Sequence, residues 1–191
     1  MDKKTLVVAS ANKGKLKEIS DILTDYNVVG YREFGLDFDI EETGETFYDN
    51  ALIKAKTISE RLGVPALADD SGLMVDALGG APGVYSARYA GDGDDEHNNQ
   101  LLLKNLQGET NRNAKFVCCL VYYTPDGEII STYGETEGRI LHQSEGQNGF
   151  GYDPLFFSYD LNKSMGIASK EEKNSVSHRF RALDQLKQKL K

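Results

Sequence analysis

The sequence predicts an α/β protein built on a mixed β-sheet. Strand-like and helix-like segments alternate through the first half of the chain, an order typical of strands joined by helices. In the second half, two β-rich segments flank Thr-Pro-Asp-Gly at residues 124–127, which is a strong hairpin signal. Because a hairpin joins antiparallel strands, we expect antiparallel members in the sheet. The length of 191 residues suits one domain, with room for two lobes.

The N-terminal segment reads as a strand, a polar loop and a helix. Residues 5–9 are a β-branched apolar run, which is typical of a central strand, and apolar residues recur at helical spacing over residues 16–23. The loop between them, residues 10–15, would present its amides and a helix N-terminus to an anion. A capped helix start with solvated lysines is the alternative interpretation. A second short strand is expected at residues 28–31.

An acidic segment then leads into a second predicted helix, residues 46–61. Thr46 is expected to cap its N-terminus, and Gly63 follows its end. Lys54 and Lys56 lie about 160° apart around the axis of this helix. We therefore expect only one of the two lysines to face a given site.

The stretch from residue 67 to residue 73, Leu-Ala-Asp-Asp-Ser-Gly-Leu, carries the strongest chemical signal. An apolar run that reads as a buried strand ends here in two carboxylates, which are costly to bury unless they are paired or bound to a metal. Taken alone, the residue types favour a surface turn. Neighbours on a strand point to opposite faces, so Asp69 and Asp70 are expected to differ in role, with Asp69 structural or supporting.

The remaining elements are predicted from periodicity and turn residues. A loop rich in Gly and Pro is expected at residues 79–83, and a second glycine-rich loop lies between residues 138 and 151. The predicted helices and strands are a helix at 94–106, strands at 115–123 and 128–133, and a C-terminal helix opened by residues 177–179 that packs Phe180, Leu183, Leu186 and Leu190 inward.

Composition narrows the classes of partner. The chain has 22 basic and 30 acidic side chains, a formal net charge of −8, which argues against a nucleic-acid partner. No apolar stretch approaches the ~20 residues of a membrane helix, and the N-terminus does not resemble a signal peptide. The adjacent cysteines Cys118 and Cys119 would point to opposite faces of a strand, so we expect no disulfide between them and a cytoplasmic location.

The loops share a chemistry that suits a metal and a polyphosphate. Mg²⁺ is usually held by one or two carboxylates and by substrate oxygens. Zinc-type spacing, a nucleophile elbow and a Cys–His pair are not evident, so attack by water with metal assistance fits better than covalent catalysis. The candidate residues are donors at Ser10, Asn12 and Lys15, carboxylates at Glu41, Glu42, Asp69 and Asp70, and cationic groups at Lys54, Lys173, His178 and Arg179.

Six motifs in order, over nearly the whole chain, resemble the inosine triphosphate pyrophosphatase family. They are Ser10-x-Asn12-x-x-Lys15, the acidic segment 41–47 with 50–55, Ala68-Asp69-Asp70-Ser71-Gly72-Leu73, the segment 78–89, Phe150-Gly151-Tyr152-Asp153-Pro154, and Ser177-His178-Arg179. The resemblance implies hydrolysis of ITP, dITP and XTP to the monophosphate and pyrophosphate with Mg²⁺, which keeps these non-standard purine nucleotides out of nucleic acids. It also implies an elongated mixed sheet with flanking helices, two lobes around a central cleft within a single domain spanning residues 1–191, and a homodimer.

The same resemblance assigns roles residue by residue. Glu41 and Asp70 would bind the metal, with Glu42 as the alternative to Glu41, and Asp70 would be the catalytic carboxylate that prepares water for attack on the α-phosphorus. Phosphate contacts would come from Ser10, Ala11, Asn12, Lys13, Gly14 and Lys15, further substrate contacts from Lys54 and Ser71, and nucleoside contacts from Phe150, Gly151, Tyr152, Asp153, Lys173, His178 and Arg179.

Base choice can be argued from donors and acceptors. Phe150 could stack on a purine, and Arg179 could donate to a 6-oxo group, which adenine lacks. Guanine also carries the 6-oxo group, so its rejection needs another contact. A pyrophosphatase for modified pyrimidine nucleotides and a non-catalytic nucleotide-binding module are the alternative functions, and a core Phe150 or a structural Arg179 are the alternative roles.

Overall fold

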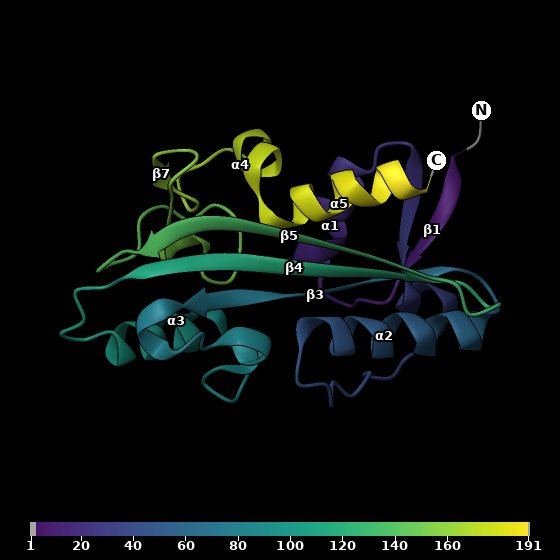
Figure 1. Cartoon of the computed structure of the whole chain (residues 1–191), viewed down its shortest axis with the longest axis horizontal. Helices are drawn as coiled ribbons and strands as arrows, with labels where there is room; N and C mark the ends of the chain where they lie inside the picture. Colours follow the sequence, from purple (N-terminus) through teal and green to yellow (C-terminus); the bar gives the residue numbers. More distant parts are fainter. Residues whose placement is uncertain (1–2, 191) are drawn as a thin grey trace. The chain divides into compact units, whose positions relative to one another are not determined.

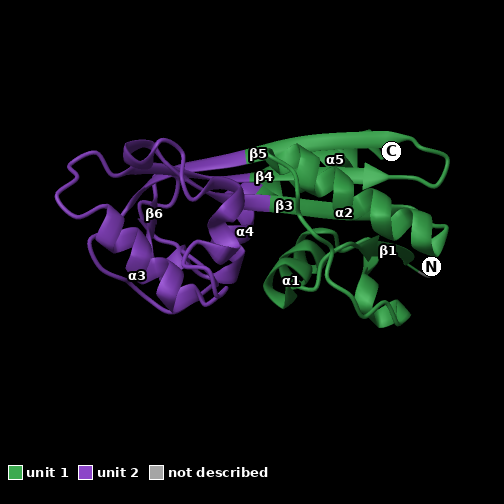
Figure 2. Cartoon of the chain, turned by 90° about the horizontal axis from the view of Figure 1, so that it is seen from below, with its two compact units in different colours: residues 1–70, 118–134, 179–191 green, residues 71–117, 135–178 purple. Residues whose placement is uncertain are grey.

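The computed structural model describes residues 3–190 and divides into two compact units. Unit 1 comprises Met1–Asp70, Cys118–Gly134 and Arg179–Lys191, and unit 2 comprises Ser71–Val117 and Glu135–His178 (Figure 2). Within residues 3–190, none of the helices combines the length and the apolar character needed to span a bilayer. The chain passes from unit 1 to unit 2 between Asp70 and Ser71, inside one strand.

Seven strands form one sheet in the order β2-β1-β3-β4-β5-β6-β7. β1 pairs in parallel with β2 and with β3, whereas β5 with β6 and β6 with β7 pair antiparallel. The predicted α/β class with a mixed sheet is therefore confirmed. The strand bounds are β1 Lys4–Val8, β2 Tyr26–Gly30, β3 Ala66–Val75, β4 Asn113–Tyr123, β5 Ile129–Ile140, β6 Phe156–Ser158 and β7 Lys163–Ser164.

Three helices cover the unit 1 part of the sheet: α1 Lys13–Ile22, α2 Phe47–Leu62 and α5 His178–Lys189. Figure 1 shows α1 and α5 on one side of the strands and α2 on the other. Each side has its own apolar core. One core joins residues of α1 and α5 to the sheet, and the other joins Ala51, Ala55 and Ile58 of α2 to the opposite face.

The two-residue period of β3 decides which helices each of its side chains meets. Leu67 belongs to the core under α1 and α5, whereas Ala66 and Ala68 belong to the core under α2. Continuing the alternation, Asp69 falls on the face of α1 and α5, and Asp70 falls on the face of α2. The predicted separation of the two carboxylates follows directly from this register.

Unit 2 has one apolar core, formed by β-strand residues, α3 (Asp95–Asn105) and the segment around Tyr152. Its other elements are α4 (Lys170–Val176) and short 3₁₀ turns. The buried Arg112 guanidinium donates to three backbone carbonyls, those of Ile140 at 2.7 Å, Leu106 at 3.2 Å and Leu141 at 2.8 Å. One side chain thus donates hydrogen bonds to backbone carbonyls at the end of α3 and at the end of β5.

The predicted start and end of α2 are confirmed, because both depend on residues close together in the sequence. Thr46 accepts a hydrogen bond from the Asp49 amide at 3.1 Å, and Gly63 adopts φ 66° after α2, as predicted. The turn favoured for residues 69–72 is wrong, because β3 runs on to Val75. The glycine-rich loop also starts later than predicted, since β5 extends to Ile140; a Cβ at Gly138 would meet the Phe157 carbonyl at 2.2 Å, so glycine there permits close strand pairing.

Candidate active site

The loop between β1 and α1 is organised by its own side chains. The Asn12 side chain caps α1 by accepting from the Lys15 amide at 3.0 Å, and Ser10 Oγ accepts from the Asn12 amide at 3.1 Å. Ala11 and Lys13 are exposed, and α1 begins at Lys13. A strand, a capped loop and a helix N-terminus therefore follow one another as the sequence predicted.

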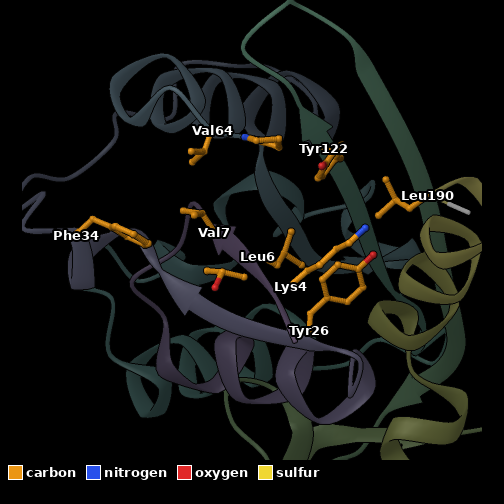
Figure 3. Close-up of a pocket in the computed structure, with 10 residues that line it drawn as sticks. Lys4, Leu6, Val7, Tyr26, Phe34, Val64, Tyr122 and Leu190 are labelled. Atoms are coloured by element: carbon orange, nitrogen blue, oxygen red, sulfur yellow. The ribbon is translucent and has the colours of Figure 1, made fainter. Parts of the chain in front are cut away.

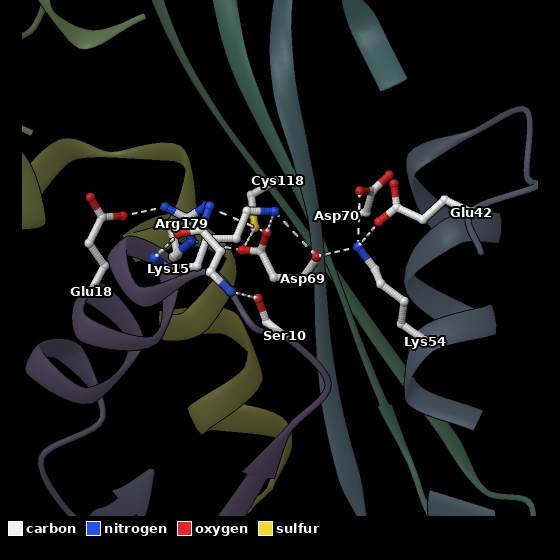
Figure 4. A network of polar contacts seen from close by, with 10 residues as sticks. Ser10, Lys15, Glu18, Glu42, Lys54, Asp69, Asp70, Cys118 and Arg179 are labelled. Atoms are coloured by element: carbon white, nitrogen blue, oxygen red, sulfur yellow. Dashed lines mark hydrogen bonds and ion pairs between the residues drawn. The ribbon is translucent and has the colours of Figure 1, made fainter. Parts of the chain in front are cut away.

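Asp69 lies in a buried ion-pair network on the α1 and α5 face (Figure 4). Its Oδ1 is 2.8 Å from Lys15 Nζ, and its Oδ2 is 2.7 Å from Arg179 Nε. The Arg179 guanidinium also contacts Glu18 of α1, and the Cys118 thiol donates to Asp69 Oδ2 at 3.2 Å. We call Lys15, Glu18, Asp69 and Arg179 the Asp69 network.

Asp70 lies on the other side of β3, against α2 (Figure 4). Lys54 Nζ is 3.2 Å from Asp70 Oδ1 and 2.6 Å from Glu42 Oε1, and it donates to the Asp69 carbonyl at 3.0 Å. Lys56 is exposed and lies 3.9 Å from Glu60, so only Lys54 faces the site, as predicted. We call Glu42, Lys54 and Asp70 the Asp70 group.

The two neighbouring carboxylates have opposite pKa shifts. Burial acts to raise the pKa of Asp69, but the charges of Arg179 and Lys15 outweigh it and hold that pKa well below its usual range. Burial raises the pKa of Asp70, and the charge of Lys54 does not fully offset it. Asp69 is thus a firmly ionised structural anion, whereas Asp70 gains a proton more readily than an ordinary aspartate.

The Asp70 group fits a divalent cation. It sets one ammonium against two carboxylates, a net charge of −1, whereas the Asp69 network balances two cations against two anions. Asp70 Oδ2 is buried and has no hydrogen-bond partner, so a strong acceptor is left over at this point. Within residues 3–190 no cluster of three or more His, Cys, Asp or Glu could hold a metal. Carboxylates in pairs suit Mg²⁺, which usually takes its other ligands from water and substrate.

The acidic loop before α2 brings Glu42 to this group. Glu41 is exposed, whereas Glu42 is half-buried on Lys54. The Gly44 amide donates to Asn50 Oδ1 at 2.8 Å, and a Cβ at Gly44 would lie 2.5 Å from Asp49 Cβ, so the loop approaches α2 closely only through glycine. Assignment of a metal ligand to Glu41 stays a prediction, with Glu42 as the carboxylate that accompanies Asp70 in the structure.

In unit 2, a second set of predicted residues surrounds Asp153. Its Oδ2 accepts from the Phe150 amide at 2.9 Å and lies 2.6 Å from Lys173 Nζ, which sits 4.7 Å from the centroid of the Phe150 ring. Lys173 and Asp153 are both buried. A Cβ at Gly149 would fall 2.1 Å from Asp153 Oδ2, so only glycine admits the carboxylate here. The ring, the ammonium and the carboxylate form one unit around residues 149–153.

The other predicted residues of unit 2 have supporting partners that the sequence did not reveal. The buried Tyr152 donates its hydroxyl to the Ser86 carbonyl at 2.7 Å, and the Gly151 amide donates to Asp95 Oδ2 at 2.8 Å. His178 stacks on Phe116 at 5.0 Å between ring centroids, and Ser71 is half-buried on β3. Asp95 and Phe116 lie 56 and 62 positions from their partners in the sequence, and no periodic pattern could have paired them.

Arg179 has partners other than the nucleoside contact that the sequence analysis predicted. Its side chain is 1% exposed, and Nε, Nη1 and Nη2 each contact a carboxylate oxygen of Asp69 or Glu18. The structure thus gives Arg179 buried structural contacts, and base recognition by Arg179 stays a prediction.

A separate hollow in unit 1 lies away from these groups. It has a volume of about 450 Å³ and is lined by Lys4–Val7 residues of β1 together with Tyr26, Phe34, Tyr122 and Leu190, among others (Figure 3). None of the predicted site residues lines it. Because residues 10–15 do not line it, this hollow is not the predicted phosphate site.

The fold and these side chains define a class: a mixed-sheet α/β protein with a capped loop between a strand and a helix, buried lysines and a carboxylate group suited to a divalent cation. The chain belongs to the Ham1 family, whose model matches residues 6–189. A dITP/XTP pyrophosphatase of Clostridium tetani (strain Massachusetts / E88) is 46% identical over 194 residues, which cover 98% of this chain and 96% of that protein. A dITP/XTP pyrophosphatase of Listeria monocytogenes serotype 4b is 48% identical over 193 residues, covering 97% of this chain and 94% of its own.

Solved structures give the same result. The Staphylococcus aureus Ham1 protein matches with a TM-score of 0.88 and 45% identity, covering 98% of each chain. A HAM1 protein from Coxiella burnetii matches with a TM-score of 0.89 and 40% identity, again over 98% of each chain. The fold and the family relationship implied by the six sequence motifs are therefore confirmed.

Proposed function

We propose that this chain is a metal-dependent nucleoside triphosphate pyrophosphatase that converts ITP, dITP and XTP to the monophosphate and pyrophosphate. Support comes from relatives named dITP/XTP pyrophosphatase at 46–48% identity over nearly the whole chain. The observation that carries the proposal is the Asp70 group, where a buried carboxylate oxygen without a hydrogen-bond partner lies in an anionic site beside the Lys54 ammonium. A small-molecule nucleotide as substrate agrees with the chain's net charge of −8, which disfavours nucleic acid.

Unit 1 supplies the residues for the phosphates and the metal in this proposal. The loop amides of residues 10–15, Lys15 and Lys54 bind the triphosphate, because backbone N–H groups at a helix start and ammonium groups favour phosphate. Asp70 would hold Mg²⁺, together with Glu41 as the sequence predicts or with Glu42, which lies on Lys54 in the structure. When bound, Mg²⁺ would neutralise phosphate charge and polarise the phosphoryl oxygens.

Asp70 is the catalytic residue of the proposed hydrolysis. Its carboxylate accepts a hydrogen bond from water, orients the water oxygen toward the α-phosphorus and takes the water proton as the P–O bond forms. The bond from the α-phosphorus to the bridging oxygen breaks, and pyrophosphate leaves with that electron pair. Lys54, 3.2 Å from Asp70, stabilises the charge that develops on the phosphates.

The nucleoside contacts in this proposal are those that the family resemblance assigns. Phe150 offers an aromatic ring for a purine to stack on, and the buried pair of Asp153 with Lys173 fixes the loop that carries the ring. Ser71, Gly151, Tyr152 and His178 complete the set that the family resemblance assigns to substrate.

Pyrophosphate release tests the proposal. With Mg²⁺, the purified chain should release pyrophosphate and monophosphate from ITP, dITP and XTP much faster than from ATP or GTP, and EDTA should stop the reaction. Asp70→Asn should lower kcat by at least about a thousandfold, whereas Asp76→Asn, the same change at an exposed position, should leave it unchanged. Faster hydrolysis of dUTP or dTTP would identify a pyrimidine pyrophosphatase, and ITP binding without turnover would identify a binding module.

Two further expectations remain proposals. A homodimer is expected from the family resemblance, and sedimentation or light scattering of the purified chain would show its mass. A cytoplasmic location fits the two free, buried cysteines, Cys118 and Cys119, because thiols persist in a reducing compartment.

A further inference from the structure

We propose that Asp69 is a positioning residue that holds the two phosphate-binding lysines in place, and that Arg179 is the counter-charge that fixes Asp69. The proposal rests on the assignment of Lys15 and Lys54 to the phosphates made above. It gives a role to a carboxylate whose purpose the sequence left open, and it adds a structural role for Arg179.

One residue contacts both lysines, each through different atoms. The side chain of Asp69 holds Lys15, with Oδ1 at 2.8 Å from Nζ. Its backbone carbonyl accepts from Lys54 Nζ at 3.0 Å and from Lys15 Nζ at 3.5 Å. Because the carbonyl belongs to β3, it ties both ammonium groups to a fixed point on the sheet (Figure 4).

The Asp69 carboxylate is itself fixed by donors on both of its oxygens. Oδ1 contacts Lys15 and Arg179 Nη2, the latter at 3.5 Å, and Oδ2 accepts from Arg179 Nε at 2.7 Å and from the Cys118 thiol at 3.2 Å. The side chain of Asp69 is 0% exposed, so no rotation into solvent competes with this arrangement. The carboxylate is therefore a rigid anchor for a long, flexible lysine.

Glu18 completes the network from the helix that also carries Lys15. The two residues lie three positions apart on α1 and so share one face of the helix. Glu18 contacts Arg179 of α5 while Lys15 contacts Asp69 of β3, so α1, β3 and α5 are linked through one charge-balanced network.

A double-mutant cycle on the KM for ITP tests the proposal. Lys15→Met should raise KM about tenfold, equivalent to about 1.4 kcal/mol, and Asp69→Asn should raise it similarly with kcat changed less than about threefold. Since Asp69 acts through Lys15, the double variant should match Lys15→Met within about twofold. If the KM of the double variant instead rises about a hundredfold, the product of the two single effects, the proposal is overturned. It is also overturned if Asp69→Asn lowers kcat at unchanged KM, because that pattern indicates a lower folded fraction.

Two controls make the result specific. Lys17→Met removes the same charge from the same helix at a side chain that is 69% exposed, and it should leave KM unchanged. If Lys15→Met also leaves KM unchanged, the phosphate assignment of the proposed function fails. If Lys15→Met raises KM but Asp69→Asn acts independently of it, the function stands and the positioning role is lost.

Glu18→Gln keeps the proposal testable if Asp69→Asn does not fold. This variant retains the contact of Arg179 with Asp69 but weakens its second contact, and it should raise KM about threefold, with the effect lost in the Lys15→Met background. An unchanged KM in Glu18→Gln would overturn the role of the network.

Discussion

Replacing Asp69 or Asp70 by Asn makes the same chemical change at two adjacent positions, and the structure predicts different costs in stability. Asp69→Asn removes a carboxylate that faces two cations, Lys15 and the buried guanidinium of Arg179. Asp70→Asn removes a carboxylate that has one cation, Lys54, and one oxygen without a hydrogen-bond partner. The first change leaves buried positive charge behind, whereas the second relieves an excess of negative charge.

The expected magnitudes differ enough to measure. Removing one partner of a buried ion pair typically costs about 3–5 kcal/mol. For a protein of this size, each kcal/mol shifts the melting temperature by roughly 2–4 °C, so Asp69→Asn should lower it by roughly 6–20 °C. For Asp70→Asn without metal, we expect a change in the free energy of unfolding within about 1 kcal/mol, because burial already penalises that carboxylate.

Urea unfolding of the metal-free variants, followed by circular dichroism at pH 7, measures both changes. The reasoning would be refuted if Asp70→Asn proved as destabilising as Asp69→Asn, or if Asp69→Asn unfolded at the wild-type midpoint. Asp76→Asn, at an exposed position, serves as the control for the amide substitution itself.

The pH dependence has opposite signs at the two positions. Because the folded-state pKa of Asp69 is lowered, its contribution to stability is complete above the ordinary value of 3.8 and is lost as the pH falls below it. Because the folded-state pKa of Asp70 is raised, its ionisation costs stability as the pH rises above 3.8. The difference in stability between wild type and Asp69→Asn should therefore shrink as the solution is acidified from pH 5.

Three further predictions follow from other parts of the chain. Glu42→Gln should weaken Mg²⁺ activation about tenfold or more if Glu42 is the second metal ligand, whereas Glu41→Gln would do so if the sequence-based assignment holds; magnesium titrations of the two variants decide between them. Arg112→Met should destabilise the fold by about 3 kcal/mol, because three carbonyls each lose a hydrogen bond from the guanidinium, although that of Leu106 keeps one from the Glu109 amide. A smaller loss in urea unfolding would contradict this interpretation. The hydrogen bond and charge of Asp92, whose Oδ2 is 2.5 Å from His97 Nδ1, raise the pKa of the His97 imidazole. NMR titration should therefore show a lower His97 pKa in Asp92→Asn. Below the ordinary value of 6.5 the pair contributes its full stability, which is lost as the pH rises through the raised pKa.

The sequence predicts those elements of the fold whose formation depends on residues close together in the chain. The strand at β1, the capped start of α2 at Thr46 and the turn before β5 depend on residues within a few positions of one another. Alternation along β3 also predicted that Asp69 and Asp70 face different ways. Taken alone, residues 69–72 favour a turn, because polar residues and glycine are usual in turns, whereas in the fold they lie within β3.

The candidate site was predictable in its chemistry but not in its pairings. The motifs selected Lys15, Lys54 and Asp70, yet the contact of Arg179 with Asp69 spans 110 positions and its contact with Glu18 spans 161. Glu18 had no signal of its own, because a glutamate among helical positions usually lies at the surface. Long-range ion pairs leave no periodic trace in one sequence, so they emerge only from the fold.

The three segments of unit 1 have a consequence for the order of events during synthesis. The first 70 residues, up to the middle of β3, are made before unit 2, which follows as residues 71–117 and 135–178 with residues 118–134 of unit 1 between them; Arg179 and the rest of α5 come after both. Until α5 emerges, Asp69 and Glu18 lack Arg179, and the apolar core under α1 lacks Leu183 and Leu186. A nascent chain that stops short of residue 179 therefore carries the loop of residues 10–15 and both aspartates without the helix that completes their unit, so removal of residues 179–191 should damage this site.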